Sequence, residues 1–141
     1  MIITNILKKI PFFSGISKED NAKIIENINL NYFPPNHIIF KQGESADKMY
    51  VIRSGSIKIY TNKNHYECSV AILKENDFFG EMALISNFPR NASAKTLDEC
   101  ELFSIDKNVL YSLLKSVPQI PEIIKSYFLI RTKEIDQINL I

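Results

Sequence analysis

The sequence predicts an α+β domain in which an antiparallel β-roll, or jelly-roll barrel, is flanked by N-terminal helices and by two C-terminal helices. The 141 residues suit one domain with a buried core. Apolar residues recur three and four positions apart at both ends of the chain, whereas the middle alternates with a period of two. The single domain, 1–141, therefore divides into helices (1–30), a β-roll (31–106) and helices (107–141).

The N-terminal part is expected to form two helices. Residues 2–10 carry isoleucine and leucine at helical spacing, and Pro11 ends this segment. Ser17 with Asp20 is typical of an N-cap and its acidic partner, and a helix over 18–28 should follow. The expected buried face of this second helix consists of Ala22, Ile25 and Ile28.

The middle of the chain is expected to consist of short strands. The polar run 61–64 reads as a hairpin tip, and Ser54-Gly55 as a turn. Closely spaced strands with turn residues between them favour an antiparallel barrel, and the absence of a GxGxxG motif argues against a doubly wound nucleotide fold. The expected strands are 38–40, 49–52, 57–60, 66–73, 92–96 and 101–105.

Two helices are expected after residue 106. A stripe of valine and leucine over 109–114 marks the first, and Val117-Pro118 ends it. Pro121 suits the first turn of the second helix, which we expect over 120–138. Arg131 falls within the apolar stripe of that helix. The stripe consists of Ile124, Tyr127, Phe128, Ile135 and Ile138.

Composition and charge exclude several classes of function. Seventeen basic and sixteen acidic residues leave a net charge of +1, with no block of like charge that would indicate a nucleic-acid or membrane-surface footprint. No apolar run reaches the length of about 18 residues that a membrane span needs. The first residues lack a basic region and a cleavage site, so we expect a cytoplasmic protein.

The cysteines and histidines do not predict chemistry. Cys68 and Cys100 lie in strand-like segments without a CxxC spacing, and we expect both to be buried free thiols. His37 and His65 stand apart from each other and from any carboxylate cluster. A cupin-like metal enzyme needs such a cluster, so we expect neither a metal site nor catalysis.

One segment, 79–93 with the sequence FGEMALISNFPRNAS, carries the functional signal. Gly80 has no Cβ and lets the backbone come close to a ligand. Glu81 can accept hydrogen bonds from a sugar diol. The first amides of a helical turn over 82–85 would point at an anion, and the planar fork of Arg90 suits phosphate oxygens. The set fits a compact phosphate joined to a ribose.

This segment resembles the phosphate-binding cassette of cyclic nucleotide-binding domains, whose pattern is F-G-E-[LM]-A-L, a short loop and then P-R-x-A-[TSA]. The resemblance extends over the whole chain, through KKIPFFSGIS, FKQGES and MYVIRSGSIKIY. Asn36 departs from the family's turn glycine, but asparagine tolerates the left-handed conformation. The matching cassette residues are Phe79, Gly80, Glu81, Met82, Ala83, Leu84, Pro89, Arg90, Ala92 and Ser93.

The resemblance implies a role for each matching polar residue. Arg90 should pair with the exocyclic phosphate oxygens, and Glu81 should accept from the ribose 2′-hydroxyl. Gly80 and Ala83 should contribute backbone amides. Asn91 could donate to the phosphate or bond the loop backbone, and both roles stay open.

The identity of the base is not decided by the cassette. A hydroxyl at the position of Ser93 is associated with cGMP in eukaryotic relatives, yet bacterial-type domains that resemble cAMP receptors also carry Ser or Thr there. We favour cAMP over cGMP because the sequence is bacterial in style. Arg131 has three possible roles: contact with the purine, a dimer interface, or extension to solvent along an apolar face.

The sequence therefore predicts a non-catalytic regulatory module that binds a 3′,5′-cyclic nucleotide and moves its C-terminal helix on binding. We expect an effector that is a missing domain or a separate partner, no direct nucleic-acid binding by this chain, and a possible homodimer through the C-terminal helix. Two alternatives remain: the sensor half of a catabolite-activator-type transcription regulator, and a ligand-free interaction module with the same fold.

Overall fold

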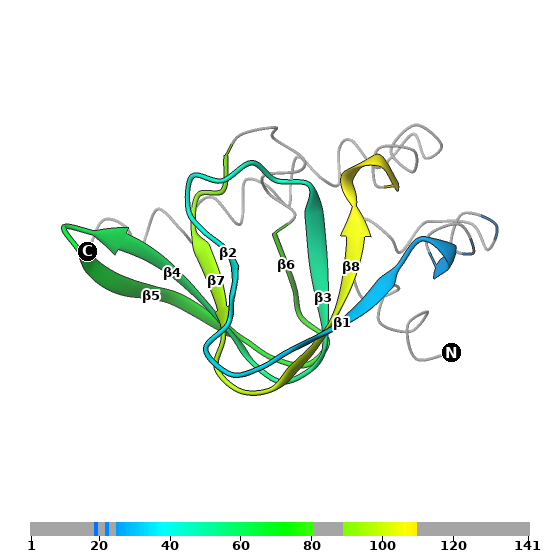
Figure 1. Ribbon diagram of the computed structural model, residues 1–141, viewed down its shortest axis with the longest axis horizontal. Helices are drawn as coiled ribbons and strands as arrows, with labels where there is room; N and C mark the ends of the chain where they lie inside the picture. Colours follow the sequence, from blue (N-terminus) through cyan, green and yellow to red (C-terminus); the bar gives the residue numbers. More distant parts are fainter. Residues whose placement is uncertain (1–18, 20–21, 23–24, 81–88, 110–141) are drawn as a thin grey trace. The chain divides into compact units, whose positions relative to one another are not determined.

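The computed structural model describes residues 19, 22, 25–80 and 89–109, and the chain divides into two compact units (Figure 1). The β-structure lies in the unit Ile28–Lys107. Its strands are β1 (Asn29–Phe33), β2 (Ile38–Phe40), β3 (Lys48–Ser54), β4 (Ile57–Lys63), β5 (Tyr66–Leu73), β6 (Phe78–Phe79), β7 (Ser93–Thr96) and β8 (Cys100–Asp106).

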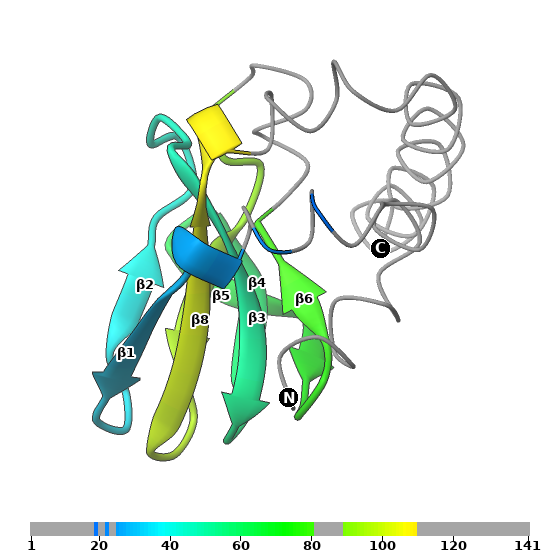
Figure 2. The same cartoon turned by 90° about the vertical axis from the view of Figure 1, so that its right-hand side faces the viewer.

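These strands form two antiparallel four-stranded sheets, in the orders β1-β8-β3-β6 and β2-β7-β4-β5 (Figures 1 and 2). The sheets pack face to face, and one core cluster draws buried side chains from both of them. This confirms the predicted antiparallel β-roll as a sandwich of two sheets. The cluster contains Ile52, Ile57, Leu73, Phe79, Ala94, Cys100 and Leu102.

The flanking helices lie almost entirely outside the described residues and stay predictions. Residues 25–26 and 107–109 are helical. Ala22, expected on a buried face, is exposed. The helix expected to reach residue 28 does not do so, because Asn27 is in a turn and β1 begins at Asn29.

The sequence does not predict β1, because two of its three apolar residues lie on the open side and only Phe33 packs against the core. Leu30 and Tyr32 are 36% and 71% exposed. The strand is held instead by its register against β8, from Asn29 opposite Ser104 to Phe33 opposite Cys100. A partner about seventy residues away along the chain therefore decides this element, and a local pattern could not reveal it. The two-residue strand β6 was also not predicted. It is too short to show a pattern, and its partner β3 is not adjacent in the sequence.

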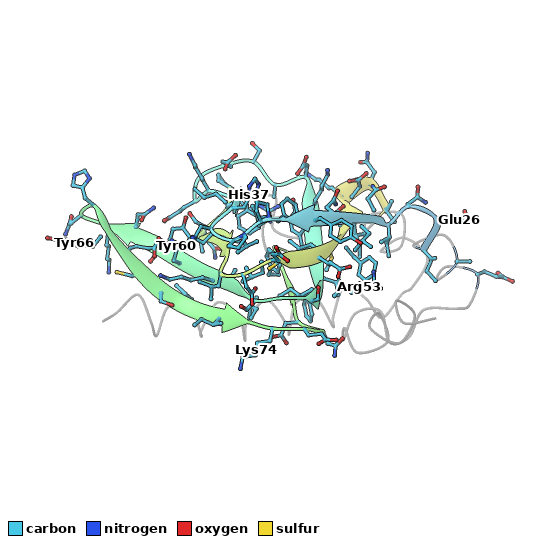
Figure 3. All side chains as sticks on the ribbon, turned by 60° about the horizontal axis from the view of Figure 1, so that its bottom comes forward. Glu26, His37, Arg53, Tyr60, Tyr66 and Lys74 are labelled. Carbon is cyan, nitrogen blue, oxygen red and sulfur yellow. The ribbon has the colours of Figure 1, made fainter. Side chains whose placement is uncertain are left out.

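The hairpin of β4 and β5 differs from the prediction in two ways. Its tip is Asn64-His65, both with positive φ (52° and 70°), as in the tight turns that suit twisted strands. Cys68, expected to be buried, is exposed, whereas Cys100 is buried. The reason is that β5 is an edge strand, and two other residues of this strand, Tyr66 and Ile72, are also 76% and 55% exposed. Figure 3 shows Tyr66 at the outer end of the hairpin.

The Thr96 side chain stabilises the turn that precedes β2. Asn36 has a φ of 59° there, so the expected left-handed conformation is confirmed. The Thr96 hydroxyl is buried, accepts a hydrogen bond from the His37 backbone N–H at 2.8 Å, and donates one to the Pro34 carbonyl at 2.6 Å. One side chain thus satisfies two backbone groups of the turn.

We expect Thr96→Val to lower the free energy of unfolding by about 1 kcal/mol, because it removes the hydroxyl partner of the His37 N–H and of the Pro34 carbonyl, which belong to an exposed turn. Urea denaturation measures the change. Thr61→Val is the control, since Thr61 is also buried but takes no part in this turn. Equal effects of the two substitutions would contradict the assigned role.

Candidate anion-binding site

The site is built around Arg90, in the segment between β6 and β7. Its side chain is only 4% exposed although it is charged. One terminal nitrogen, Nη1, donates to the Gly80 carbonyl at 2.5 Å, and the other, Nη2, donates to the Lys48 carbonyl at 2.6 Å. Gly80 follows β6 and Lys48 begins β3, so two separate segments of one sheet aim the guanidinium.

An aromatic cluster lies beneath the guanidinium. The central carbon of the guanidinium is 4.0 Å from the centroid of the Phe40 ring, a distance at which a cation interacts with an aromatic face. The Phe40 ring packs against Tyr50 and Phe79, with centroids 6.3 Å and 5.9 Å apart, and those two rings stack at 5.2 Å. The cluster joins β2, β3 and β6.

Gly80 makes room for this arrangement. Its φ is +82°, a conformation that side chains disfavour. A Cβ at Gly80 would lie 2.9 Å from Nη1 of Arg90 and 3.3 Å from Cε2 of Phe40. The glycine of the cassette therefore lets the backbone carbonyl and the guanidinium approach each other.

The backbone of Arg90 is fixed as firmly as its side chain. Its N–H donates to the Glu44 carbonyl at 2.8 Å, and its carbonyl accepts from the Gly43 N–H at 2.7 Å. Ser93 adds a third link, because its buried hydroxyl accepts from the Gln42 N–H at 2.8 Å. The loop between β2 and β3 thus holds Arg90 and Ser93 through backbone hydrogen bonds.

The electrostatics of the site favour an anion. The Gly80 and Lys48 carbonyls are neutral, so they orient the guanidinium without cancelling its charge. Burial raises the pKa of the Tyr50 phenol, although the nearby charge of Arg90 acts in the opposite direction. A buried positive charge is costly in a low-dielectric interior, and an incoming anion offsets that cost.

The structure brings together part of the predicted site. Phe79, Arg90, Ala92 and Ser93 are buried, and Arg90 contacts the Gly80 carbonyl, whereas Asn91 is exposed. Glu81, Met82, Ala83 and Arg131 lie outside the described residues, and their roles stay predictions.

Sequence reasoning missed two partners of Arg90. Phe40 is apolar and reads as an ordinary strand residue, and its position before the FKQGES turn gave no sign of a contact with the cassette. Lys48 contributes only its backbone carbonyl. A main-chain group carries no residue-type signal, so no motif could have identified it.

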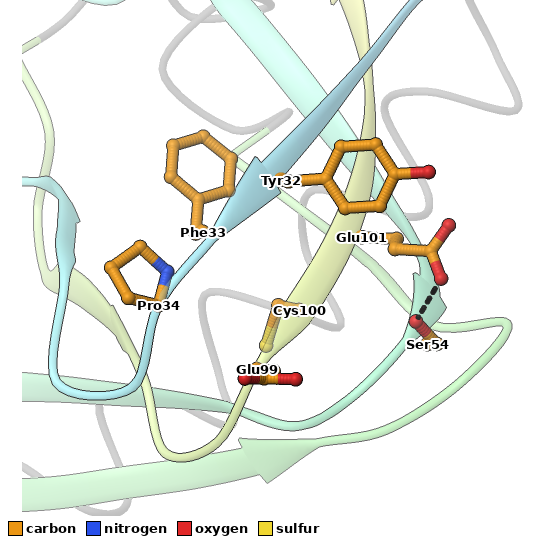
Figure 4. Close-up of a pocket in the computed structure, with 7 residues that line it drawn as sticks. All are labelled: Tyr32, Phe33, Pro34, Ser54, Glu99, Cys100 and Glu101. Carbon is orange, nitrogen blue, oxygen red and sulfur yellow. Dashed lines mark hydrogen bonds between the residues drawn. The ribbon is translucent and has the colours of Figure 1, made fainter.

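A separate hollow of about 490 Å³ lies where β1 and β3 end and β8 begins (Figure 4). The carboxylate of Glu101 is engaged there, because it accepts from the Ser54 hydroxyl at 3.1 Å and pairs with Arg53 at 3.0 Å. Among the described residues, none of the Arg90 partners named above lines this hollow. Its lining consists of Tyr32, Phe33, Pro34, Ser54, Glu99, Cys100 and Glu101.

Within the described ranges, no group of three or more His, Cys, Asp or Glu side chains is placed to hold a metal ion. The same part of the chain contains no helix long and apolar enough to cross a membrane.

Comparison with known proteins identifies the family. Residues 30–117, which include the whole segment from β2 to β8, match the cyclic nucleotide-binding domain. The chain belongs to the cyclic nucleotide-binding domain family. Domains of this family are typically non-catalytic regulatory modules, and the matched residues include the segment 79–93.

Two curated relatives and one solved structure illustrate the similarity. The chain is 31% identical over 118 residues to the CRP-like cAMP-activated global transcriptional regulator of Mycobacterium tuberculosis, covering 83% of this chain and 53% of that protein. It is 28% identical over 116 residues to the cAMP-dependent protein kinase regulatory subunit of Pyricularia oryzae, covering 82% and 29%. The chain thus spans about half the length, or less, of these relatives.

The solved structure is that of the Thermus thermophilus catabolite activator protein. It superposes with a TM-score of 0.76 at 24% identity, over 90% of this chain and 60% of that one. At this identity the likeness shows the fold, which is the fold of the cyclic nucleotide-binding domain.

Proposed function

We propose that this domain is a sensor that binds a 3′,5′-cyclic nucleotide, cAMP in preference to cGMP, with Arg90 on the cyclic phosphate. The observation that carries the proposal is the buried guanidinium, aimed by the carbonyls of Gly80 and Lys48 and covered on one face by Phe40. A guanidinium presents five N–H donors in a planar fork, a geometry that suits phosphate oxygens.

Preorganisation strengthens the case for a phosphate. The side chain of Arg90 and its backbone are both held by contacts within the protein. Binding therefore costs little side-chain ordering, a cost that otherwise reduces affinity. A charge-assisted, planar contact of this kind suits the exocyclic oxygens of a cyclic phosphate.

The ribose contacts are proposed on the family pattern. Glu81 accepts a hydrogen bond from the 2′-hydroxyl, and the amides of Gly80 and Ala83 face the phosphate or the ribose. A ligand without the 2′-hydroxyl would leave the Glu81 carboxylate desolvated without this donor, which disfavours deoxy analogues. Phe79, Met82 and Ala92 complete the apolar part of the cassette, and Asn91 is proposed at its rim.

The choice of base is proposed from a relative, because Ser93 does not decide it. The Ser93 hydroxyl accepts a hydrogen bond from the loop at Gln42, and a hydroxyl that accepts one bond still has a proton to donate. Ser93 therefore suits either base. The preference for cAMP is supported by the 31% identical relative, whose name describes it as cAMP-activated.

We propose that the output is a movement of the last helix, with Arg131 on its apolar stripe, toward an effector in another domain or partner. A ligand shifts such an equilibrium only by its difference in affinity for the two states. The alternative of a sensor half of a catabolite-activator-type regulator is favoured by the same relative, of which this chain spans 53%. Location in the cytoplasm belongs to the same proposal.

A thermal unfolding panel tests the specificity that we propose. Saturating cAMP should raise the unfolding midpoint of the nucleotide-stripped protein, since a ligand at a hundred times its Kd stabilises the fold by about 2.7 kcal/mol. cGMP should raise it less, and 2′-deoxy-cAMP and linear 5′-AMP should raise it least. Equal shifts with all four nucleotides would contradict a site that recognises the cyclic phosphate and the 2′-hydroxyl.

A further inference from the structure

We propose that Phe40 is a positioning residue for Arg90: its ring supports the guanidinium at the place where it meets an anion. The inference rests on the proposed function, and it adds a residue outside the cassette to the site. Phe40 is the last residue of β2, half-buried, and its ring centroid is 4.0 Å from the guanidinium carbon.

The Phe40 ring contacts Arg90 in a different way from the two carbonyls. The Gly80 and Lys48 carbonyls accept hydrogen bonds from Nη1 and Nη2, whereas the guanidinium carbon lies over the Phe40 ring. Cation–π attraction favours a guanidinium held over an aromatic face, so the ring opposes displacement of the Arg90 side chain away from it.

Phe40 can act as a rigid platform because it is itself held. Tyr50 and Phe79 pack against its ring, with centroids 6.3 Å and 5.9 Å away. The strand pairing places Phe40 opposite Ala94 of β7, one residue from Ser93. Its position is therefore fixed by the same elements that fix the cassette.

Gly80 ties the platform to the cassette. A Cβ at Gly80 would lie 3.3 Å from Cε2 of Phe40 and 2.9 Å from Nη1 of Arg90. The glycine, the ring and the guanidinium are therefore packed against one another. An aliphatic side chain at position 40 would fill part of this volume. It would not provide a flat, electron-rich face for the cation.

Ordinary core packing is the competing explanation, since Phe40 also packs against the buried cluster of the sandwich. Core packing predicts a loss of stability with no change in the affinity of the folded protein. Positioning predicts a loss of affinity that another aromatic residue restores. Phe33 provides the matched control, because it packs against the same cluster from β1.

The test measures cAMP affinity by calorimetry and stability by urea denaturation for Phe40→Leu, Phe40→Tyr and Phe33→Leu, at a temperature where each is folded. We expect Phe40→Leu to weaken cAMP binding by about tenfold, and Phe40→Tyr to bind like the wild type. Phe33→Leu should lose stability but keep its affinity. Wild-type affinity in folded Phe40→Leu would overturn the proposal.

A ligand-free measurement separates this inference from the proposed function. The Nε–H resonance of Arg90, observed by NMR in the free protein, should be shifted by the Phe40 ring and should have a high order parameter. Phe40→Leu should lose the shift and lower the order parameter. If the wild type binds no cyclic nucleotide but these changes occur, the proposed function fails and the positioning survives. An unchanged Arg90 resonance in Phe40→Leu would overturn the positioning.

Discussion

Replacing Arg90 with alanine is expected to weaken cAMP binding by about a hundredfold or more, as loss of one partner of a buried charge pair costs about 2–5 kcal/mol. The substitution removes the cation that the Gly80 and Lys48 carbonyls aim at the ligand. Calorimetric titration of the folded variant measures the change. Urea denaturation beside it establishes that the variant is folded under the same conditions.

Arg53→Ala is the matched control for this prediction. It makes the same chemical change at an arginine whose side chain is 40% exposed and paired with Glu101 at 3.0 Å. Exposed ion pairs contribute at most about 1 kcal/mol, so stability should change little and cAMP affinity not at all. If Arg90→Ala bound cAMP as tightly as Arg53→Ala, Arg90 would not be the phosphate ligand.

Gly80→Ala is expected to weaken cAMP binding by at least about tenfold and to lower stability by about 1–2 kcal/mol. The stability term comes from the left-handed backbone at φ +82°. The affinity term comes from Nη1 of Arg90, only 2.9 Å from the new methyl group, which must move away. The end of a side chain moves more readily than a backbone, so we expect the guanidinium to be displaced from the position in which it would meet the ligand. Calorimetry and denaturation measure the two terms separately.

Gly43→Ala separates strain from displacement. Gly43 has a φ of +92°, close to that of Gly80, but a Cβ there would meet nothing within 4 Å. We expect a similar loss of stability and an unchanged affinity for cAMP. Loss of affinity in both variants would show that displacement of the Arg90 guanidinium by a new methyl group is not needed to explain the effect at Gly80.

The sequence was sufficient for the elements whose pattern is local. The alternation in residues 57–60 and 66–73 predicted β4 and β5. Residue type and spacing marked Gly80 and Arg90 as candidate site residues. The structure then showed both residues in contact through the Gly80 carbonyl. That contact needs the folded loop between them, and spacing alone did not establish it.

Other features depend on pairing between distant segments. β1 exists through its register with β8, and Cys68 is exposed because β5 lies at a sheet edge. Phe40 meets Arg90 only because β2 pairs with β7. In each case the deciding neighbour is far along the chain, beyond the reach of periodicity or a short motif.

Calorimetric titration of the nucleotide-stripped chain with cAMP, beside linear 5′-AMP, tests whether this domain binds a cyclic nucleotide. We expect saturable binding of one cAMP per chain, and binding of 5′-AMP weaker by at least about tenfold, because the proposed site is shaped for a cyclic phosphate. The absence of saturable binding of cAMP and of cGMP, at several temperatures and without displacement of a labelled cyclic nucleotide, would contradict the account. It would leave a domain of this family that acts as an interaction module.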